Sequence, residues 1–480
     1  METTKNAAIH YPFWLNGEWI SDGKATEIRA PYNGELIGTV SCGSRQHAEL
    51  ALDAAVRAFE QTRRLPSYER QRILATTARL LSERKEEFAQ VLARESGKPI
   101  KIARFEVERT VFTLQVSSEE ATRIGGEVLP LDLLPSTRGR WGIIRRFPVG
   151  PVIAIAAFNF PLILAAHKIG PAIAAGCSVI LKPPPQDPIT TLMLAKLFEE
   201  AGTPAGAINV LPLANEDASL LVQDTRARML TFTGSITVGW ELRNIAGRKR
   251  VLLELGGNAA AIVHRDADLE YAAQRCATGA FSYAGQSCVS VQRIFVHRDV
   301  QETFMQELIA AVQQLRVGDP LDEATDVGPM IRERDAVRAL DWVQEAISGG
   351  ARLLCGGQRK ASLLQPTVLT GTSPRMRVNC QEIFAPVVTV EPYGDFESAL
   401  HQVNDSPFGL QTGLFTRDAS LIFRAYEELN VGGVIAGDIP TWRIDHMPYG
   451  GVKDSGTGRE GVRYTIQEMT EMKLLVMNIA

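Results

Sequence analysis

No cysteine pair in this sequence has the spacing of a metal site or of a disulfide framework. The chain has 480 residues, and its six cysteines lie far apart, without a C-x-x-C motif. They are Cys42, Cys177, Cys276, Cys288, Cys355 and Cys380. This spacing argues against a zinc knuckle. We therefore expect no metal ion and reduced thiols, as in a cytoplasmic protein.

An excess of charge of one sign is also missing. The sequence has 51 Lys and Arg against 55 Asp and Glu, a formal net charge of -4. Nothing in this balance indicates a nucleic-acid or anionic-membrane partner. Residues 1–16 lack the basic region, apolar run and small-residue cleavage site of a signal peptide, so none is predicted.

The sequence has no uninterrupted hydrophobic run that favours a membrane span. Val149–Ala166 is almost wholly apolar and nearly long enough to cross a bilayer. Pro151, Asn159 and Pro161 interrupt it, however, and His167 follows. These residues favour a buried strand, a turn and a buried helix, so we expect no membrane partner.

Strand-like and helical segments alternate regularly from Pro151 onward. The strand-like runs are Val152–Ala157, Ser178–Leu181, Ala207–Leu211, Met229–Phe232 and Val251–Leu253. The helical stretches between them are Leu162–Ala175, Thr190–Ala201, Glu216–Gln223 and Ile236–Ala246. Apolar strands alternating with helices predict a parallel sheet that is covered on both faces, in a doubly wound, nucleotide-binding α/β fold.

The flanking regions show other patterns. Ser67–Arg94 has helical spacing with Gly97 as a stop signal, and Phe105–Ala121 is a second helical stretch. Residues 126–147 read as two strands around a turn, with Pro130 favouring an edge strand. A second alternating block covers residues 259–451, and the tail Thr465–Ile479 resembles an edge strand in need of a partner.

Polar residues follow several of the predicted strands. The segment Gly234-Ser235 follows one strand and opens a helix, which is either ordinary turn chemistry or a phosphate site. Lys182 follows another strand, where it is either solvated or beside a cofactor ribose or phosphate. Asn159 is either a turn residue or an oxyanion donor at the edge where ligands bind in such sheets.

Two further residues are candidates for covalent chemistry. Glu254 ends an apolar strand before a Gly-Gly turn, and it either faces water or is a base with a raised pKa in a dry cleft. Cys288 lies in the loop Ala284-Gly-Gln-Ser-Cys288. A single cysteine is usually a small buried hydrophobe, but this polar loop could expose a thiol that needs local activation.

Seven motifs in order resemble the aldehyde dehydrogenase superfamily over nearly the whole chain. They are Asn159-Phe160-Pro161, Lys182-Pro183, Phe232-Thr-Gly-Ser235, Glu254-Leu-Gly-Gly257, Gly285-Gln-Ser-Cys288, Glu382-Ile-Phe384 and Pro448-Tyr-Gly-Gly451-Val-Lys-Asp-Ser455-Gly456. The resemblance implies an α/β fold. It comprises a Rossmann-type doubly wound cofactor domain (1–125 and 148–255), an α/β catalytic domain (256–462) and a small β oligomerisation element (126–147 and 463–480).

The resemblance also implies roles for these residues. Cys288 would attack the aldehyde carbon, Asn159 would hold the thiohemiacetal oxyanion, and Glu254 would activate water to hydrolyse the thioester. The implied cofactor is NAD or NADP, and the implied assembly is a homodimer or homotetramer. The residues expected at the cofactor are Phe158, Lys182, Pro185, Gly234, Ser235, Gly256, Glu382 and Phe384.

Three positions depart from the family pattern. Members that prefer NAD often have Glu three residues after the lysine, where this chain has Pro185. Without that carboxylate, a 2′-phosphate meets no negative charge, so we predict that NADP is tolerated or even preferred. Ala385 replaces a common glycine, and Gly437 replaces a common asparagine before the substrate-side loop.

The substrate pocket is implied by resemblance as well. Its expected residues are Arg109, Phe160, Ile163, His167, Ser287, Val289, Trp442 and Arg443. The two arginines either contact substrate or form structural ion pairs. His167 and Arg443 add polarity, and the segments around Cys288 and His446 resemble the lactaldehyde and semialdehyde branch. We therefore expect a small polar or hydroxylated aldehyde as substrate.

Two other enzyme classes stay open. A coenzyme-A-acylating aldehyde dehydrogenase generally lacks the hydrolytic carboxylate, so Glu254 argues against it. A cofactor-independent cysteine hydrolase or esterase needs a histidine partner, and no histidine lies in a supporting motif.

Overall fold

The central feature of the computed structural model, which describes residues 9–479, is an eight-stranded sheet. Its order is β24-β12-β11-β8-β9-β10-β2-β3. The bounds are β2 Phe13–Leu15, β3 Glu18–Ile20, β8 Val152–Ile155, β9 Val179–Lys182, β10 Ile208–Val210, β11 Met229–Thr233, β12 Arg250–Glu254 and β24 Gly456–Thr457. Strands β8 to β12 are parallel, which confirms the predicted doubly wound arrangement.

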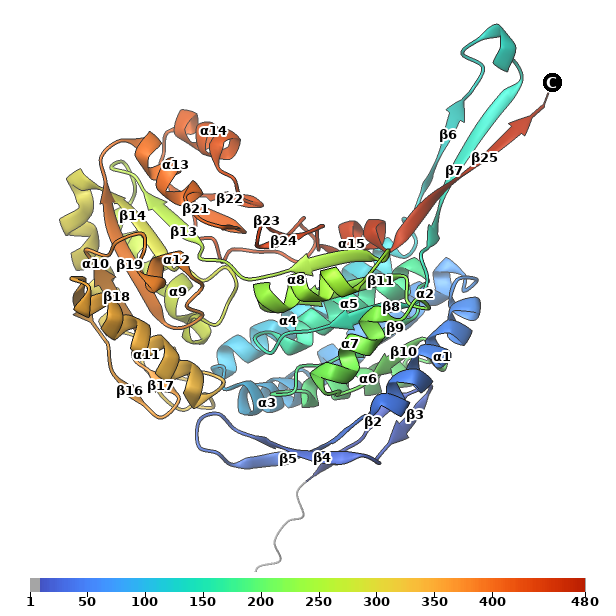
Figure 1. The fold of residues 1–480 in the computed structure, drawn as a ribbon, viewed down its shortest axis with the longest axis horizontal. Helices are drawn as coiled ribbons and strands as arrows, with labels where there is room; N and C mark the ends of the chain where they lie inside the picture. The colour runs from blue at the N-terminus through green and yellow to red at the C-terminus, as the bar shows by residue number, and fades with distance from the viewer. Residues whose placement is uncertain (1–8, 480) are drawn as a thin grey trace, which may run out of the picture.

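Helices cover both faces of this sheet (Figure 1). They are α1 Arg45–Thr62, α2 Ser67–Glu83, α3 Lys85–Ser96, α4 Ile100–Glu120, α5 Pro161–Ala175, α6 Ile189–Glu200, α7 Asn215–Gln223 and α8 Ile236–Ile245. One difference from the predicted helices is that 67–94 is not continuous. Arg84, with φ -107° and ψ 20°, separates α2 from α3. The apolar side chains Leu74, Leu81 and Phe88 stay buried across the break, so their spacing does not reveal it.

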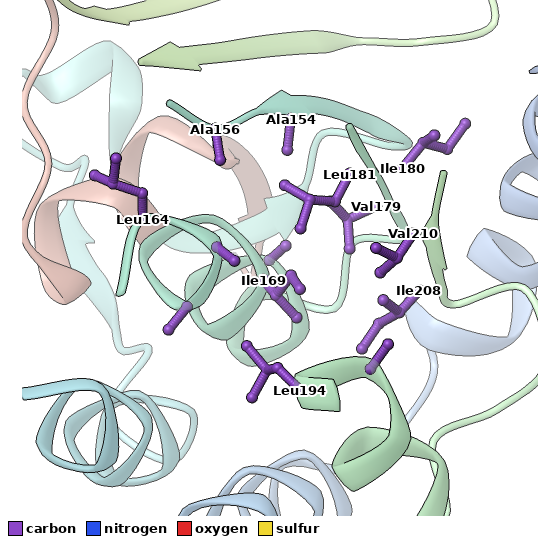
Figure 2. Close-up of a cluster of buried hydrophobic side chains, with 14 of the residues drawn as sticks. Ala154, Ala156, Leu164, Ile169, Val179, Ile180, Leu181, Leu194, Ile208 and Val210 are labelled. Carbon is purple, nitrogen blue, oxygen red and sulfur yellow. The ribbon is translucent and has the colours of Figure 1, made fainter. Parts of the chain in front are cut away.

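The core beneath β8, β9 and β10 explains why these strands are apolar throughout. Figure 2 shows their buried side chains, among them Val179, Leu181 and Ile208, beside Ile169 of α5 and Leu194 of α6. Every residue of α5 is buried. Each fully buried Leu, Ile or Val side chain contributes about 1.5–3 kcal/mol relative to exposure. This packing fixes the first turn of α5 and, with it, the segment that carries Asn159.

A second sheet of seven strands forms the other lobe, with the order β15-β18-β19-β14-β13-β21-β22. Its strands are β13 Ala260–Val263, β14 Arg293–His297, β15 Arg352–Cys355, β18 Thr367–Thr370, β19 Val387–Tyr393, β21 Gln411–Phe415 and β22 Gly433–Ala436. The helices of this lobe are α9 Leu269–Phe281, α10 Gln301–Gln313, α11 Glu333–Ser348, α12 Arg377–Cys380, α13 Phe396–Asn404 and α14 Ala419–Glu428.

Smaller elements complete the body. A three-stranded sheet joins β1 His10–Tyr11, β4 Lys24–Arg29 and β5 Leu36–Cys42. Two small antiparallel sheets have two strands each. One joins β16 Arg359–Lys360 and β17 Leu363–Leu364, and the other joins β20 Phe408–Gly409 and β23 Val452–Lys453. Single 3-10 turns span Pro135–Thr137 and Arg298–Val300, and a turn with left-handed residues spans Ser282–Gly285. No helix within residues 9–479 is long and apolar enough to cross a membrane.

An arm of three antiparallel strands projects from the body (Figure 1). It comprises β6 Gly126–Pro130, β7 Arg140–Pro148 and β25 Thr470–Asn478, in the order β25-β7-β6. The predicted pair of strands is confirmed, and the strand with Pro130 is an edge strand. The tail differs in its start, because α15 Val462–Glu468 precedes β25. The predicted domain bounds stay a prediction.

Candidate active site

Four of the predicted site residues lie at the carboxyl edge of the parallel strands. Asn159 follows β8, Lys182 ends β9, Ser235 follows β11 and Glu254 ends β12. The chain runs from β8 to β10 in one direction and returns to β11 on the other side of β8. Ligands bind where the strand order reverses in this way, so these residues surround the expected ligand position.

Cys288 reaches this edge from the second lobe. Its loop is preceded by three residues with left-handed backbones, Tyr283 (φ 51°), Ala284 (φ 52°) and Gly285 (φ 67°). A Cβ at Gly285 would collide with the Ala385 carbonyl, so this close turn needs glycine. The loop passes beside the Gly-Gly turn after Glu254, because a Cβ at Gly257 would lie 3.2 Å from the Cys288 carbonyl oxygen.

Glu254 is buried, with 3% of its surface exposed. Neither carboxyl oxygen has a hydrogen-bond partner among residues 9–479. Burial raises the pKa of Glu254 well above its ordinary value, and Glu460 adds to this effect, while Arg443 and Lys168 oppose it. A Cβ at Gly450 would lie 2.9 Å from one of its oxygens. The interpretation of Glu254 as a strand-end carboxylate in water is therefore wrong, because its side chain is buried.

The Cys288 thiol is half-buried and contacts Tyr449, whose hydroxyl lies 3.0 Å from Sγ. Burial raises the pKa of this thiol to about 11, and the Tyr449 contact lowers it in part. Glu382, Arg443 and Glu254 also act on it through their charges. Glu254 and Cys288, which are distant along the chain, thus share one environment.

Asn159 is held by its main chain. Its carbonyl accepts a hydrogen bond of 2.9 Å from the buried ammonium of Lys98, whereas its side-chain Oδ1 has no partner among residues 9–479. Lys98 pairs with buried Glu106, which accepts the backbone N–H groups of Leu162 (3.1 Å) and Ile163 (3.2 Å). The carboxylate thus satisfies amides in the first turn of α5, a position that favours negative charge.

The same ammonium joins the Asn159 segment to the cysteine loop. Lys98 lies 4.4 Å from the ring centre of Phe160 and 4.5 Å from that of Tyr283. These two rings are 5.8 Å apart, in an edge-on arrangement. The oxyanion candidate and the nucleophile candidate are therefore anchored to one buried cation.

The phosphate side of the expected cofactor site fits a dinucleotide. Ser235 is exposed at the start of α8 and makes no side-chain cap, so amides of the first turn face outward. A Cβ at Gly234 would contact the Phe232 ring at 2.5 Å, so glycine keeps the turn narrow. Lys182 is 5% exposed, and burial lowers the pKa of its ammonium. Pro185 is exposed in the turn after β9.

The nicotinamide side is formed by both lobes. Glu382 lies over Gly256 and accepts the N–H of Gly257 at 3.1 Å. Burial raises the pKa of Glu382 to about 7. Phe384, with φ 49°, packs its ring 5.9 Å from that of Phe158. Gly257, Ser287, Glu382 and Phe384 are among the residues that line a narrow hollow.

The predicted substrate residues separate into two groups. Ser287 and Val289 flank Cys288, and Val289 packs with Tyr449. Ile163 is buried in the first turn of α5, and Trp442 is 47% exposed. Arg109, His167 and Arg443 meet around a common carboxylate, Asp445. This polar group reaches the tyrosine that contacts the thiol, because Arg443 stacks on the Tyr449 ring at 3.8 Å.

The two arginines differ in the hydrogen bonds that they make to Asp445. Arg109 donates two hydrogen bonds to it, at 2.9 and 2.6 Å, and His167 makes a third contact at 3.0 Å. Arg443 lies farther from the carboxylates around it. Its nearest carboxylates, Asp445 and Glu460, lie at 3.6 and 3.7 Å, and its Nε has no hydrogen-bond partner among the described residues. Arg109 therefore fits a structural ion pair, and Arg443 keeps unused donors.

Several residues of the site were not singled out in the sequence. Lys98, Glu106, Asp445 and Glu460 carry no local motif, because their partners come from other elements; Arg109 and Asp445 are 336 residues apart. Tyr449 belongs to a motif that was noted, but its spacing gives no sign that its hydroxyl meets Cys288. Only the fold brings these side chains together.

The sequence matches a known family model over most of its length. Residues 19–475 match the model described as the aldehyde dehydrogenase family. The chain is also 44% identical to 3-sulfolactaldehyde dehydrogenase of Priestia aryabhattai, over 99% of this chain and 100% of that protein.

Solved structures show the same similarity. Aldehyde dehydrogenase 21 of Physcomitrella patens, in complex with the reaction product succinate, superposes with a TM-score of 0.97 at 42% identity, covering 99% of each chain. Glyceraldehyde-3-phosphate dehydrogenase GapN of Methanocaldococcus jannaschii, complexed with NADP, gives a TM-score of 0.92 at 38% identity, covering 96% of this chain and 100% of that one.

Proposed function

We propose that this chain, which belongs to the aldehyde dehydrogenase family, uses Cys288, Asn159 and Glu254 to oxidise a small aldehyde that carries an anionic group. The enzyme is an NAD(P)-dependent oxidoreductase. The observation that carries the residue assignment is that Cys288 contacts Tyr449 and that the charge of Glu254 acts on both, at the edge of the sheet where Asn159 follows β8.

The chain's residues divide the chemistry between them. Cys288 releases its thiol proton to solvent, and the thiolate Sγ attacks the carbonyl carbon. The side-chain amide of Asn159, with the Cys288 backbone N–H, donates to the oxygen that becomes negative. One such donor typically stabilises the transition state by about 3–4 kcal/mol. NAD(P)⁺, when bound, accepts the two electrons and the hydrogen that leave the carbon, and a thioester to Cys288 remains.

Glu254 acts in the second half of the reaction. Burial keeps Glu254 protonated while the aldehyde binds, so it first releases this proton to solvent. The resulting buried carboxylate is a strong base that takes a proton from water, whose oxygen forms a bond to the thioester carbon while the bond to Sγ breaks. Lys182 and Glu382 would hold the two riboses of the cofactor, Ser235 the pyrophosphate, and Phe158 and Phe384 the nicotinamide side.

The substrate class rests on the charge around Arg443. Burial opposes the ionisation of Asp445 and Glu460, yet contacts with His167 and Arg109 lower the pKa of Asp445, and Lys168 lowers that of Glu460. Burial lowers the pKa of His167 and raises that of Glu254, so both favour their neutral forms. The three cations Arg109, Lys168 and Arg443 then face two carboxylates, which leaves one positive charge for an anionic substrate.

The relatives support a small polar or anionic substrate. Their names mention a sulfonated lactaldehyde, a complex with the dicarboxylate succinate, and a phosphorylated glyceraldehyde. These compounds share a short chain with an anionic group. We propose that this enzyme acts on an aldehyde of this class, and we do not assign it any one of these compounds.

The experiment follows the covalent intermediate. In Glu254→Gln, thioester hydrolysis should fall by about 10²–10⁴-fold, so mixing with aldehyde and cofactor gives one equivalent of reduced cofactor and then slow turnover. Mass spectrometry should find the acyl group on Cys288. Cys288→Ser should lose both the burst and the adduct.

Cys355→Ser is the matched control, since this half-buried thiol lies in β15, the edge strand of the seven-stranded sheet, and it should keep full turnover. Aldehydes of equal length that end in carboxylate, sulfonate, hydroxyl or methyl test the substrate class in the same assay. The anionic compounds should exceed the methyl one in kcat/KM by at least about tenfold, which corresponds to about 1.4 kcal/mol. Turnover by Cys288→Ser, or no preference for charge, would contradict the respective half of the proposal.

The assembly and location of the enzyme are part of the proposal. The exposed apolar side chains of β25 and its unpaired edge support association of copies through the arm into a homodimer or homotetramer. A cytoplasmic location, expected from six cysteines that form no disulfide, stays a prediction.

A further inference from the structure

The position of Tyr449 beside the thiol is fixed by both its backbone and its ring. Its N–H donates to the Glu460 carbonyl at 3.0 Å, and its carbonyl accepts the Glu460 N–H at 2.7 Å. The residue is 4% exposed and packs with Val289, Leu410 and Met447. A side chain held in this way loses little further freedom when it acts on a neighbouring atom.

The hydroxyl of Tyr449 has one hydrogen-bond partner in the described part of the chain, the Sγ of Cys288 at 3.0 Å. While the cysteine is a thiol, either atom could donate. Once it is a thiolate, the sulfur can only accept, and the phenol must donate. Hydrogen bonds to ionised groups are about twice as strong as neutral ones, so this contact favours the charged form.

We propose that Tyr449 is a catalytic residue, which donates a hydrogen bond to the Cys288 thiolate and so helps to form the nucleophile. The proposal rests on the function proposed above for Cys288. It gives a chemical role to a hydroxyl that the reaction steps described so far do not use.

Arg443 strengthens this donor. Its guanidinium carbon lies 3.8 Å from the centre of the Tyr449 ring, and a cation over an aromatic face draws electron density from the ring. The polarised phenol is a better donor. Arg443 therefore acts on the thiolate through the ring as well as through its own charge.

The other charged groups around the thiol act in both directions. Glu382 and Glu254 disfavour a thiolate when they are ionised, and Arg443 favours it. Burial keeps the pKa of Tyr449 well above its ordinary value, so the phenol retains its proton at neutral pH and cannot serve as the base. Donation is thus the role that remains for the hydroxyl.

The test measures the ionisation of Cys288 directly. Iodoacetamide reacts with the thiolate, so its rate of reaction at Cys288, followed by peptide mass spectrometry over a range of pH, gives the apparent pKa of the thiol in the full-length enzyme. Tyr449→Phe keeps the ring and removes only the hydroxyl. We expect the apparent pKa to rise by about one unit, which makes alkylation at neutral pH about tenfold slower. The acid limb of the kcat/KM profile should move upward with it.

Tyr393→Phe is the matched control, because this buried hydroxyl contacts His264 in the second lobe at 2.7 Å and not the thiol. It should leave the alkylation profile unchanged. Thermal unfolding of both variants shows whether either change merely loosens the fold. Arg443→Met keeps the hydroxyl and should give a smaller upward shift.

An alkylation profile in folded Tyr449→Phe that matches the native one would overturn the proposal, and so would equal shifts in both tyrosine variants. Two separate measurements test the role of Cys288 and the role of Tyr449. Turnover by Cys288→Ser would refute Cys288 as nucleophile, whereas the alkylation profile reports on the Tyr449 contact in either case.

Discussion

The residue three positions after Lys182 bears on which cofactor the enzyme accepts. Pro185 is exposed in the turn after β9, at the carboxyl edge of the sheet, and it offers neither a charge nor a side-chain hydrogen bond. A carboxylate at this position would accept from a ribose 2′-hydroxyl and would repel a 2′-phosphate. The native enzyme should therefore tolerate NADP.

Replacing this residue tests the point. Pro185→Glu should lower kcat/KM for NADP by at least about tenfold relative to NAD, an effect of about 1.4 kcal/mol, measured by absorbance of the reduced cofactors. Pro185→Gln, which has nearly the same size without charge, is the control and should change the ratio little. NADP turnover by the native enzyme below about one-hundredth of that with NAD, a gap of about 2.7 kcal/mol, would contradict the tolerance.

Single residues also show where sequence reasoning ends. Glu254 and Cys288 could be singled out because a strand end and a polar loop mark them locally. Arg109 and Arg443 looked equivalent in the sequence, since each could contact substrate or form an ion pair. The difference between them depends on Asp445, which makes two hydrogen bonds to one and none shorter than 3.5 Å to the other. Such a difference depends on contacts between residues that are distant along the chain, and the sequence does not show these contacts.

Helix α4 links the core to the site through one ion pair. Lys98, just before α4, and Glu106 within it are both fully buried, and together they hold the Asn159 carbonyl and the first amides of α5. Removing one partner of a buried pair leaves an uncompensated charge, which costs about 3–5 kcal/mol.

Lys98→Met should therefore lower the free energy of unfolding by about 3–5 kcal/mol in urea denaturation, and kcat should fall because Asn159 loses its anchor. Lys85→Met is the control. Lys85 of α3 pairs with Glu108 of α4 at the surface, where such a pair contributes about 0–1 kcal/mol. Similar losses in the two variants would show that the buried pair has no special role.

The elements themselves were largely predictable. The parallel strands and their helices followed from apolar runs between turn residues, because a sheet covered on both faces leaves no polar positions on its strands. The break at Arg84 was not predictable, since the buried side chains keep their spacing across it. The start of β25 was also missed, because the apolar positions of α15, which include Val462 and Ile466, merge with those of the strand.

At the scale of the whole molecule, the arm formed by β6, β7 and β25 exposes apolar side chains to solvent. On β25, Met472 is 68% exposed, Leu474 50% and Val476 48%, and the strand has a partner on one side only, within the described chain. An apolar strand with an open edge pairs readily with another chain. We expect copies of the enzyme to associate there.

A charge on this strand should prevent the association. The double variant Leu474→Asp/Val476→Asp should shift the mass measured by light scattering toward that of one chain, 52.5 kDa. Tyr68→Asp, at an exposed aromatic residue of α2, is the control and should keep the native mass. A native enzyme that is already monomeric would contradict the expectation.

The short connection between the arm and the site has a further consequence. Glu460, which holds Lys168 beside Glu254, is separated from the first residue of β25 only by α15 and its two flanking residues. A neighbouring copy that pairs with β25 would also restrain the C-terminal end of α15 and, through this helix, the carboxylate of Glu460. Dilution that separates the copies would then lower the activity of each active site. The rate measured at very low enzyme concentration would therefore depend on assembly as well as on the chemical steps.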